Sequence, residues 1–281
     1  MTSHKKPGVA FWVTVVVGAA LFMAAGRAQT ANREPPELQS LHEKRLTKMR
    51  TFVESLTIAE VDGASERPIK LVGEPVLRFS DPDRLHSDGT LWVWGDRGRP
   101  RAFSEVFLKD DNESVLYHGV TSTADGPLVG WKNKRTIWSP RRAGISFAAL
   151  PDAPEPPRSS RARRAQMKRL AKRFTAYEVF PEDRRSELRL LMTPVYQYDD
   201  RETGIRDGGA FVFALGTNPE LILLLEAHGA DDADDRWNYA VARRGNAPLF
   251  VELDGEPVWQ APVYFEGAAD DVYFYSISRI N

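Results

Sequence analysis

Apolar positions follow two different periods along this chain, and the periods separate helices from strands. Two apolar triplets recur at steps of three and four residues: Leu46, Met49 and Val53 in the first, and Met167, Leu170 and Phe174 in the second. This spacing places each triplet on one face of a helix. The pattern therefore predicts two amphipathic helices, one in each half of the chain.

Most of the remaining chain carries short aromatic and β-branched runs that are bounded by turn residues. The runs 90–94 and 210–213 each follow an Asp-Gly pair, and 272–277 is the last such run. Runs of this kind are typical of strands. No helix-length segment connects them, so the strands are predicted to pair antiparallel. The run 221–225 is also predicted as a strand, although Pro219 before it is compatible with the start of a helix.

The chain contains an internal repeat. Residues 75–107 align with residues 194–226 at a constant offset of 119 and without gaps. The matched positions include Asp88-Gly89 with Asp207-Gly208, and Trp92 and Trp94 with Phe211 and Phe213. Positions that two divergent copies share are expected to belong to the scaffold.

The repeat and the predicted elements together define the expected fold. The predicted fold class is α+β, with two tandem copies of a module in which one helix packs on an antiparallel sheet of about six strands. The first module is predicted to span residues 36–150 and the second 161–281. A stiff, proline-rich linker is predicted at 151–160.

Residues 1–28 carry the pattern of an export segment. Lys5 and Lys6 precede an uncharged and mostly apolar run, Val9 to Gly26, and small residues occupy positions 26 and 28. This is the arrangement of a signal peptide cleaved after Ala28. An uncleaved membrane anchor and a buried core helix are the alternatives. The first two predict an extracytoplasmic protein that is periplasmic, secreted or tethered to the membrane.

Composition excludes several kinds of site. The chain has no cysteine, which excludes disulfides, thiolate metal sites and a cysteine nucleophile. Its 38 basic and 39 acidic residues nearly cancel, which argues against a nucleic-acid partner. No cofactor motif, no metal-site pattern and no serine-hydrolase motif occurs, so no cofactor and no metal is predicted. Glu105 and His118 flank a predicted hairpin and could face a cleft. Whether the protein is an enzyme stays open.

A basic segment is the first candidate site. Five cationic residues form the candidate set: Arg161, Arg163, Arg164, Lys168 and Arg169. No acidic residue occurs from Arg158 to Tyr177. A basic amphipathic helix can lie on an anionic lipid surface or polymer. The alternative is that this is the helix of the second module, with its apolar stripe buried and its arginines in solvent.

Glu226 and His228 form the second candidate site, because the first copy has no equivalent pair. A His and carboxylates can make a metal site or an acid–base pair, whereas the aspartate-rich residues 231–235 also suggest a solvated acidic loop. The loop Asp81–Gly89 could bind calcium or serve as a turn, and its recurrence favours the turn. Trp92 and Trp94 share one sheet face, which favours core under the helix over a sugar-binding platform.

The leading functional hypothesis is a non-catalytic binding or interaction protein for an anionic component of the cell envelope, either lipid or polymer. The alternative is an envelope hydrolase that uses carboxylates such as Glu226 or Asp81 in a cleft between the modules. The sequence does not predict the oligomeric state.

The leading hypothesis predicts that retention of the protein on anionic vesicles or polymer weakens when salt is added, because ions screen exposed charges. Neutralising Arg161, Arg163 and Arg164 is expected to weaken retention as well. Co-sedimentation at two salt concentrations measures both effects. Retention that neither change affects would contradict the hypothesis.

Overall fold

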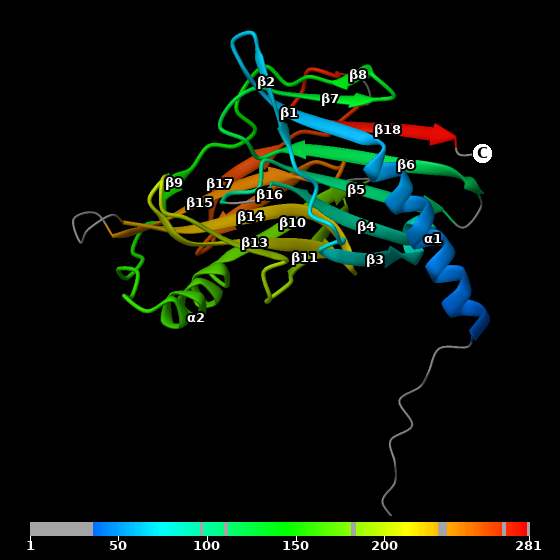
Figure 1. Ribbon diagram of the computed structural model, residues 1–281. Helices are drawn as coiled ribbons and strands as arrows, with labels where there is room; N and C mark the ends of the chain where they lie inside the picture. The colour runs from blue at the N-terminus through cyan, green and yellow to red at the C-terminus, as the bar shows by residue number, and fades with distance from the viewer. Residues whose placement is uncertain are drawn as a thin grey trace, which may run out of the picture.

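The computed structural model describes residues 36–95, 98–109, 112–180, 184–229, 235–265 and 268–279 (Figure 1). The predicted export segment lies outside the described residues. Among those that are described, no helix is both long enough and apolar enough to cross a membrane. Residues 36–150 are called the first half below, and residues 151–279 the second half.

Each half begins with a helix and continues in strands. The first half contains α1 (Pro36–Glu54), β1 (Leu56–Asp62), β2 (Ser65–Ile69), β3 (Leu77–Asp81), the 3₁₀ turn η1 (Pro82–Arg84), β4 (His86–Trp94), β5 (Ala102–Lys109), β6 (Asn112–Ser122), β7 (Leu128–Lys132), β8 (Arg135–Trp138) and β9 (Ala148–Ala149). The second half contains α2 (Ser160–Ala171), β10 (Phe174–Phe180), β11 (Arg184–Leu190), β12 (Tyr196–Asp200), β13 (Ile205–Leu215), β14 (Asn218–His228), β15 (Arg236–Arg243), β16 (Leu249–Leu253), β17 (Glu256–Ala261) and β18 (Tyr273–Arg279).

The described strands form three antiparallel sheets. Four strands pair in the order β2-β1-β7-β8, and five pair in the order β18-β6-β5-β4-β3. The largest sheet runs β17-β16-β10-β11-β13-β14-β15-β9, with β12 paired to β13. The eight strands on this path curl strongly into a half-barrel. The predicted α+β fold of two helix-on-sheet modules is therefore wrong, because the protein is mainly β.

An exchange of strands explains why separate modules do not form. At the end of the first half, β9 pairs with β15 of the second half, and Ala149 lies opposite Asn238. At the end of the second half, β18 pairs with β6 of the first half, and Ile277 lies opposite Tyr117. Each half thus supplies the edge strand of a sheet in the other half. Sequence patterns identify such strands but not their distant partners.

Backbone pairing within the halves recurs at the offset of 119. The N–H of Val72 donates to the carbonyl of Val93 at 2.9 Å, and the N–H of Leu191 donates to the carbonyl of Val212 at 2.8 Å. The two hydrogen bonds therefore lie at equivalent positions of the repeat. In the first half the connection is an isolated bridge between Leu71, outside the named strands, and Trp94 of β4, whereas in the second half it joins β11 and β13 within one sheet.

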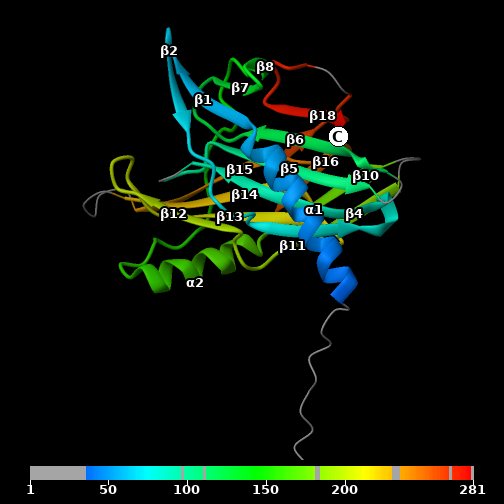
Figure 2. The same ribbon diagram turned by 45° about the vertical axis from the view of Figure 1, so that its right-hand side comes forward.

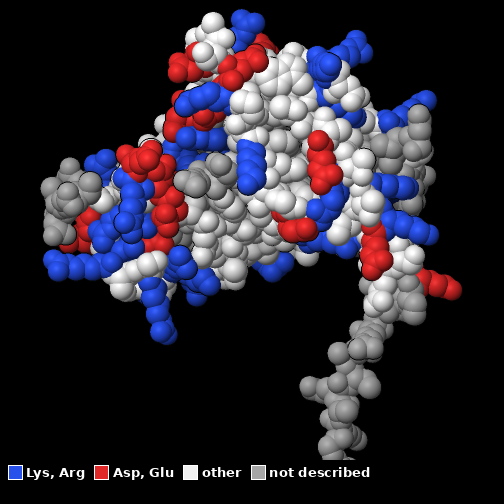
Figure 3. Space-filling model, in the orientation of Figure 1, with Lys and Arg blue, Asp and Glu red and all other residues white. Residues whose placement is uncertain are grey.

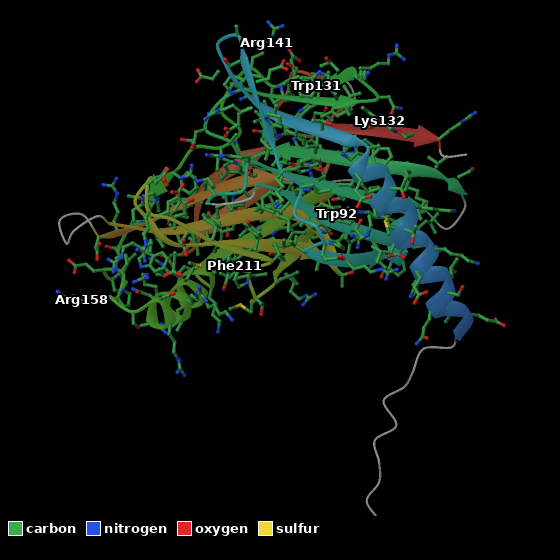
Figure 4. All side chains as sticks on the ribbon, in the orientation of Figure 1. Trp92, Trp131, Lys132, Arg141, Arg158 and Phe211 are labelled. Carbon is green, nitrogen blue, oxygen red and sulfur yellow. The ribbon has the colours of Figure 1, made fainter. Side chains whose placement is uncertain are left out.

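The helices cover the outer faces of the sheets (Figures 1 and 2). On α1, Met49 and Val53 pack in one buried cluster with Trp92 and Trp94. Figure 4 shows Trp92 beside α1. The tryptophan face is therefore core and not an exposed platform. On α2, Met167 packs in a second cluster that includes Phe211 and Phe213. Ser159 caps this helix by accepting a hydrogen bond from the N–H of Ala162 at 3.2 Å.

A third apolar cluster lies between the two halves. Leu91 and Val93 of β4 pack in it with Val212, Ile222 and Leu224 of β13 and β14. Residues 221–225 are fully buried in β14, which confirms the strand interpretation for this run. Strands that are covered on both faces need apolar side chains on both faces, so strict alternation is lost.

The recurring Asp-Gly pairs have a structural role. Asp88 accepts a 2.8 Å hydrogen bond from Nε of Arg78, and Asp207 binds arginines of α2. The following glycine leaves room for an aromatic ring, because a Cβ on Gly208 would lie 2.2 Å from the Tyr198 ring. The same relation holds between Gly89 and Phe79. The turn interpretation of these pairs is therefore wrong, because Asp88-Gly89 lies inside β4 and Asp207-Gly208 inside β13, and neither Gly89 nor Gly208 has a positive φ.

Substituting Gly208→Ala is expected to lower the free energy of unfolding by about 1–3 kcal/mol, because the added methyl overlaps a buried ring. Gly73→Ala is a matched control, since a Cβ there meets no heavy atom within 4 Å. The control is expected to change the free energy by less than about 0.5 kcal/mol. Urea unfolding measures both values, and equal values for the two variants would contradict the packing argument.

Candidate functional site

Glu226, a predicted site residue, lies on β14 and is completely buried. Its carboxylate accepts hydrogen bonds from Nε and Nη2 of Arg99 at 2.6 and 2.8 Å and from the Tyr198 hydroxyl at 2.9 Å. The ring nitrogen Nε2 of His228 lies 2.7 Å from the same carboxylate. Burial acts to raise the pKa of Glu226, but hydrogen bonds from Arg99, His228 and Tyr198 outweigh it and lower the pKa. Glu226 is therefore an ionised and fully bound carboxylate.

Arg99 makes two further contacts besides those with Glu226. Its Nη1 donates to Asp125 at 2.5 Å, and its guanidinium lies 4.2 Å from the centre of the Phe147 ring. We call Arg99, Asp125, Tyr198, Glu226 and His228 the Glu226 cluster. Glu226 and His228 are in contact, and Glu226 also forms an ion pair between the halves with Arg99. Residues 231–234 lie outside the described residues.

The predicted basic set on α2 divides into two groups. Arg163 is buried, and its Nε donates to Asp207 at 2.6 Å while its Nη1 binds the carbonyl of Pro157. Arg163 therefore anchors the helix and is not available to a ligand. Nε of Arg164 lies 3.3 Å from Oδ1 of Asp207, but the side chain is half exposed. Arg161 and Arg169 are exposed.

Binding of an anion to the remaining residues stays a prediction. Figure 4 shows Arg158 beside the beginning of α2. In Figure 3, basic side chains gather around this helix with acidic side chains next to them. The surface is therefore mixed in charge, which weakens its attraction for an anionic surface.

A cleft between the halves was not predicted at the residue level. It has a volume of about 310 Å³. We define it by six of the polar residues that line it: Arg84, His86 and Glu105 from the first half, and Asn218, Glu220 and Arg244 from the second. Glu105, one of the two hairpin residues that could face a cleft, lines this one. His118 instead lies buried against the ring of Phe52, with the ring centres 5.2 Å apart.

Glu220 is held in the cleft through one of its oxygens. Oε1 accepts hydrogen bonds from Nη1 of Arg84 at 2.5 Å and from Nδ2 of Asn218 at 2.8 Å. Burial raises the pKa of Glu220 to about 8 against the attraction of Arg84, and the nearby Glu178 and Glu105 add to the rise. The raised pKa favours the neutral acid at pH 7, and the second oxygen, Oε2, lies next to Gly245.

Glu105 is held in a similar way from the other side. Its Oε2 accepts a 2.9 Å hydrogen bond from Nη2 of Arg244, which also donates from Nη1 to Thr121 at 2.7 Å. Burial raises the pKa of Glu105, and Arg244 opposes the rise. Burial, Lys109 and Arg84 lower the pKa of His86 to about 4, so its ring is neutral at pH 7.

Three lining residues carry buried polar atoms that have no hydrogen-bond partner in the described part of the chain. They are Nδ1 of His86, Oδ1 of Asn218 and Nε of Arg244. A buried polar atom without a partner is costly, and such atoms are rare in folded proteins. Atoms in the same state also occur elsewhere in the fold, for example in His118, Gln166 and Trp237, but these three share one cavity wall, whereas both oxygens of Glu226 are hydrogen-bonded.

The cleft and the Glu226 cluster occupy corresponding places in the repeat. At the offset of 119, Glu226 corresponds to Phe107 and Arg99 corresponds to Asn218. Phe107 and Asn218 both line the cleft. In the Glu226 cluster, these two positions hold a carboxylate and an arginine that bind each other. In the cleft, the same two positions hold an aromatic ring and an amide, and the space beside them is open.

Sequence reasoning missed this site because its residues are isolated along the chain. Arg84 and Glu220 are 136 residues apart, and Glu105 and Arg244 are 139 residues apart. No short motif links them. The repeat did contain a signal for this site. Glu105 corresponds to Leu224 and Glu220 corresponds to Arg101, so neither carboxyl is shared by the two copies.

No family model, curated protein or solved structure shows a significant match to this chain. The described side chains include no group of three or more His, Asp or Glu that could hold a metal ion. The function of the cleft is therefore argued from its geometry and charge.

Substituting Glu220→Gln tests the state of this carboxyl. A carboxyl whose pKa is raised by folding stabilises the protein at low pH, and that contribution is lost as the pH rises from about 4.5 towards about 8. Glutamine does not ionise, so the stability of the variant relative to wild type is expected to rise over this range, by at most about 1.4 kcal/mol per pH unit. Urea unfolding between pH 5 and 9 measures the difference.

Glu226→Gln on the same strand is the control. Because the pKa of Glu226 is lowered, its contribution is complete above the unfolded pKa and is lost only in acid. The difference between this variant and wild type is expected to stay constant from pH 6 to 9. A constant difference for Glu220→Gln as well would show that Glu220 is ionised in the fold.

Proposed function

We propose that this protein is an extracytoplasmic binding protein that takes a small polar molecule into the cleft between its halves. One observation carries the proposal: charged side chains from both halves converge on one cavity and leave buried polar atoms without partners. A polar ligand would supply those partners.

The cost of the arrangement supports a role beyond folding. Buried ion pairs are often no more stabilising than apolar side chains of similar size, because both charges lose their hydration. The Glu226 cluster shows that this fold can close the corresponding place with a single well-bonded ion pair. An open polar cleft is therefore not a requirement of the fold.

The size of the cleft limits the ligand. A volume of about 310 Å³ lies at the small end of ligand pockets, which span about 300–1,000 Å³. A single small molecule or one unit of a polymer fits this volume. Because both halves line the cleft, a bound ligand would add contacts between them and raise the stability of the folded protein.

Hydrolysis in the same cleft is the second candidate, and Glu220 favours it. A carboxyl that is protonated at pH 7 can act as a general acid, and Glu105 provides a second carboxyl in the same cavity. Of the carboxylates that the sequence suggested, Glu226 is bound elsewhere. Asp81 does not line the cleft but contacts a lining residue, with its Oδ2 3.3 Å from Nδ2 of Asn218.

Ligand-observed NMR with a mixture of small amino acids, carboxylates, amines, polyols and nucleosides tests the binding proposal. At least one probe is expected to bind wild type and to lose at least about tenfold in affinity in Glu220→Ala, because hydrogen bonds to such groups contribute about 1–3 kcal/mol. Glu226→Gln, outside the cleft, is expected to bind like wild type. If no probe class binds, or if Glu220→Ala binds unchanged, the proposal fails. Release of product from a bound probe would favour the hydrolase.

A further inference from the structure

The chemistry of the cleft wall identifies the class of ligand, an inference that rests on the proposed function. Two of the three cations that line the cleft, Arg84 and Arg244, are already paired with carboxylates, and the third is Lys109. Arg84 binds Glu178 and Glu220, and Arg244 binds Glu105. A charged ligand would compete with these pairs or bring an uncompensated charge into a buried site, and either is costly.

The polar atoms in the wall include donors and acceptors together. Oδ1 of Asn218 is a buried acceptor and Nε of Arg244 a buried donor, both without a hydrogen-bond partner in the described part of the chain, and the carboxyl of Glu220 is a second donor when it is protonated. A hydroxyl group donates and accepts at the same time, whereas a carboxylate only accepts and an ammonium group only donates. Several hydroxyl groups on one molecule therefore match this wall better than a single ionised group.

Aromatic rings complete the wall. Phe107, Tyr273 and Tyr275 line the cleft. The ring of Phe107 lies 4.1 Å from His86 and 6.4 Å from Tyr275, measured between ring centres. Such rings offer an apolar surface to the C–H groups of a ring whose edge carries hydroxyls.

Comparison with the Glu226 cluster argues against a carboxylate ligand. There, the carboxylate is held by two nitrogens of Arg99. The corresponding residue in the cleft is Asn218, which cannot form this two-pronged contact. The corresponding residue to Glu226 is Phe107, so the charge of the cluster is replaced by an aromatic face.

We propose that the cleft binds an uncharged, hydroxylated ring, which is the chemistry of a neutral sugar unit. Phe107 and Tyr275 contact its C–H face, while Asn218, Glu220 and Arg244 bind its hydroxyl groups. Lys109, the remaining cation of the lining, lies 4.7 Å from the Tyr117 ring.

Probes that share one ring and differ in charge test the ligand class. Glucose and N-acetylglucosamine are neutral, glucuronate adds a carboxylate, and glucosamine adds an ammonium group. Galactose and mannose vary the hydroxyl positions. Titration calorimetry and NMR are expected to show that a neutral member binds at least about tenfold more tightly than glucuronate and glucosamine.

Two variants connect that binding to the cleft. The double substitution Phe107→Glu with Asn218→Arg copies the residues of the Glu226 cluster and is expected to abolish binding of the neutral ring. Tyr275→Leu removes one aromatic face while keeping an apolar side chain, and it is expected to weaken binding at least about fivefold even if the double variant does not fold. Thermal unfolding of each variant measures folding separately.

The outcomes separate this inference from the proposed function. Tighter binding of glucuronate or glucosamine than of every neutral sugar would overturn the ligand class and leave binding in the cleft intact. The same holds if no sugar binds while another class of the broader probe mixture does. Binding of a neutral sugar that both folded variants retain would place it outside the cleft and overturn the inference.

Discussion

The face-to-face packing of two antiparallel sheets is the contact on which the rest of this structure depends. Apolar side chains of β4 meet those of β13 and β14 in a layer that excludes water. This layer fixes the two halves relative to each other. It also brings together charged residues that are more than 120 positions apart in sequence, as in Arg99 and Glu226.

The buried charges follow from that packing. Charges that are removed from water must find opposite charges or hydrogen bonds, or they lose their ionisation. The same fold shows both results. Glu226 stays ionised because arginine, tyrosine and histidine all contact it, whereas Glu220 has a raised pKa because burial exceeds the attraction of Arg84. Two carboxyls on one strand are thus suited to different roles.

Local features of the fold were predictable from sequence, and long-range features were not. The spacing of Met49 and Val53 identified a buried helix face, and the apolar run 221–225 identified a central strand. The predicted module fold was wrong because β9 and β18 pair across the halves, and hydrophobic period carries no information about distant partners. Arg163 was assigned to a binding surface because its partner, Asp207, lies 44 residues away.

The candidate site was predictable only in part. The expected carboxylates led to Glu226, which is bound in an ion pair, and to Asp81 beside the cleft. The cleft itself takes single residues from several strands, so no spacing reveals it. Comparing the two copies position by position would have selected Glu105 and Glu220, because each is replaced by an uncharged or oppositely charged residue in the other copy.

The pairing of β18 with β6 also affects how the chain can assemble. A ribosome makes β6 well before β18, so the first half has an unpaired sheet edge until the last strand has been made. Unpaired edges attract other strands, including those of neighbouring chains. The order of synthesis therefore favours an assembly step in which both halves close together once β18 has been made, so β18 is needed to protect a sheet formed from the first half.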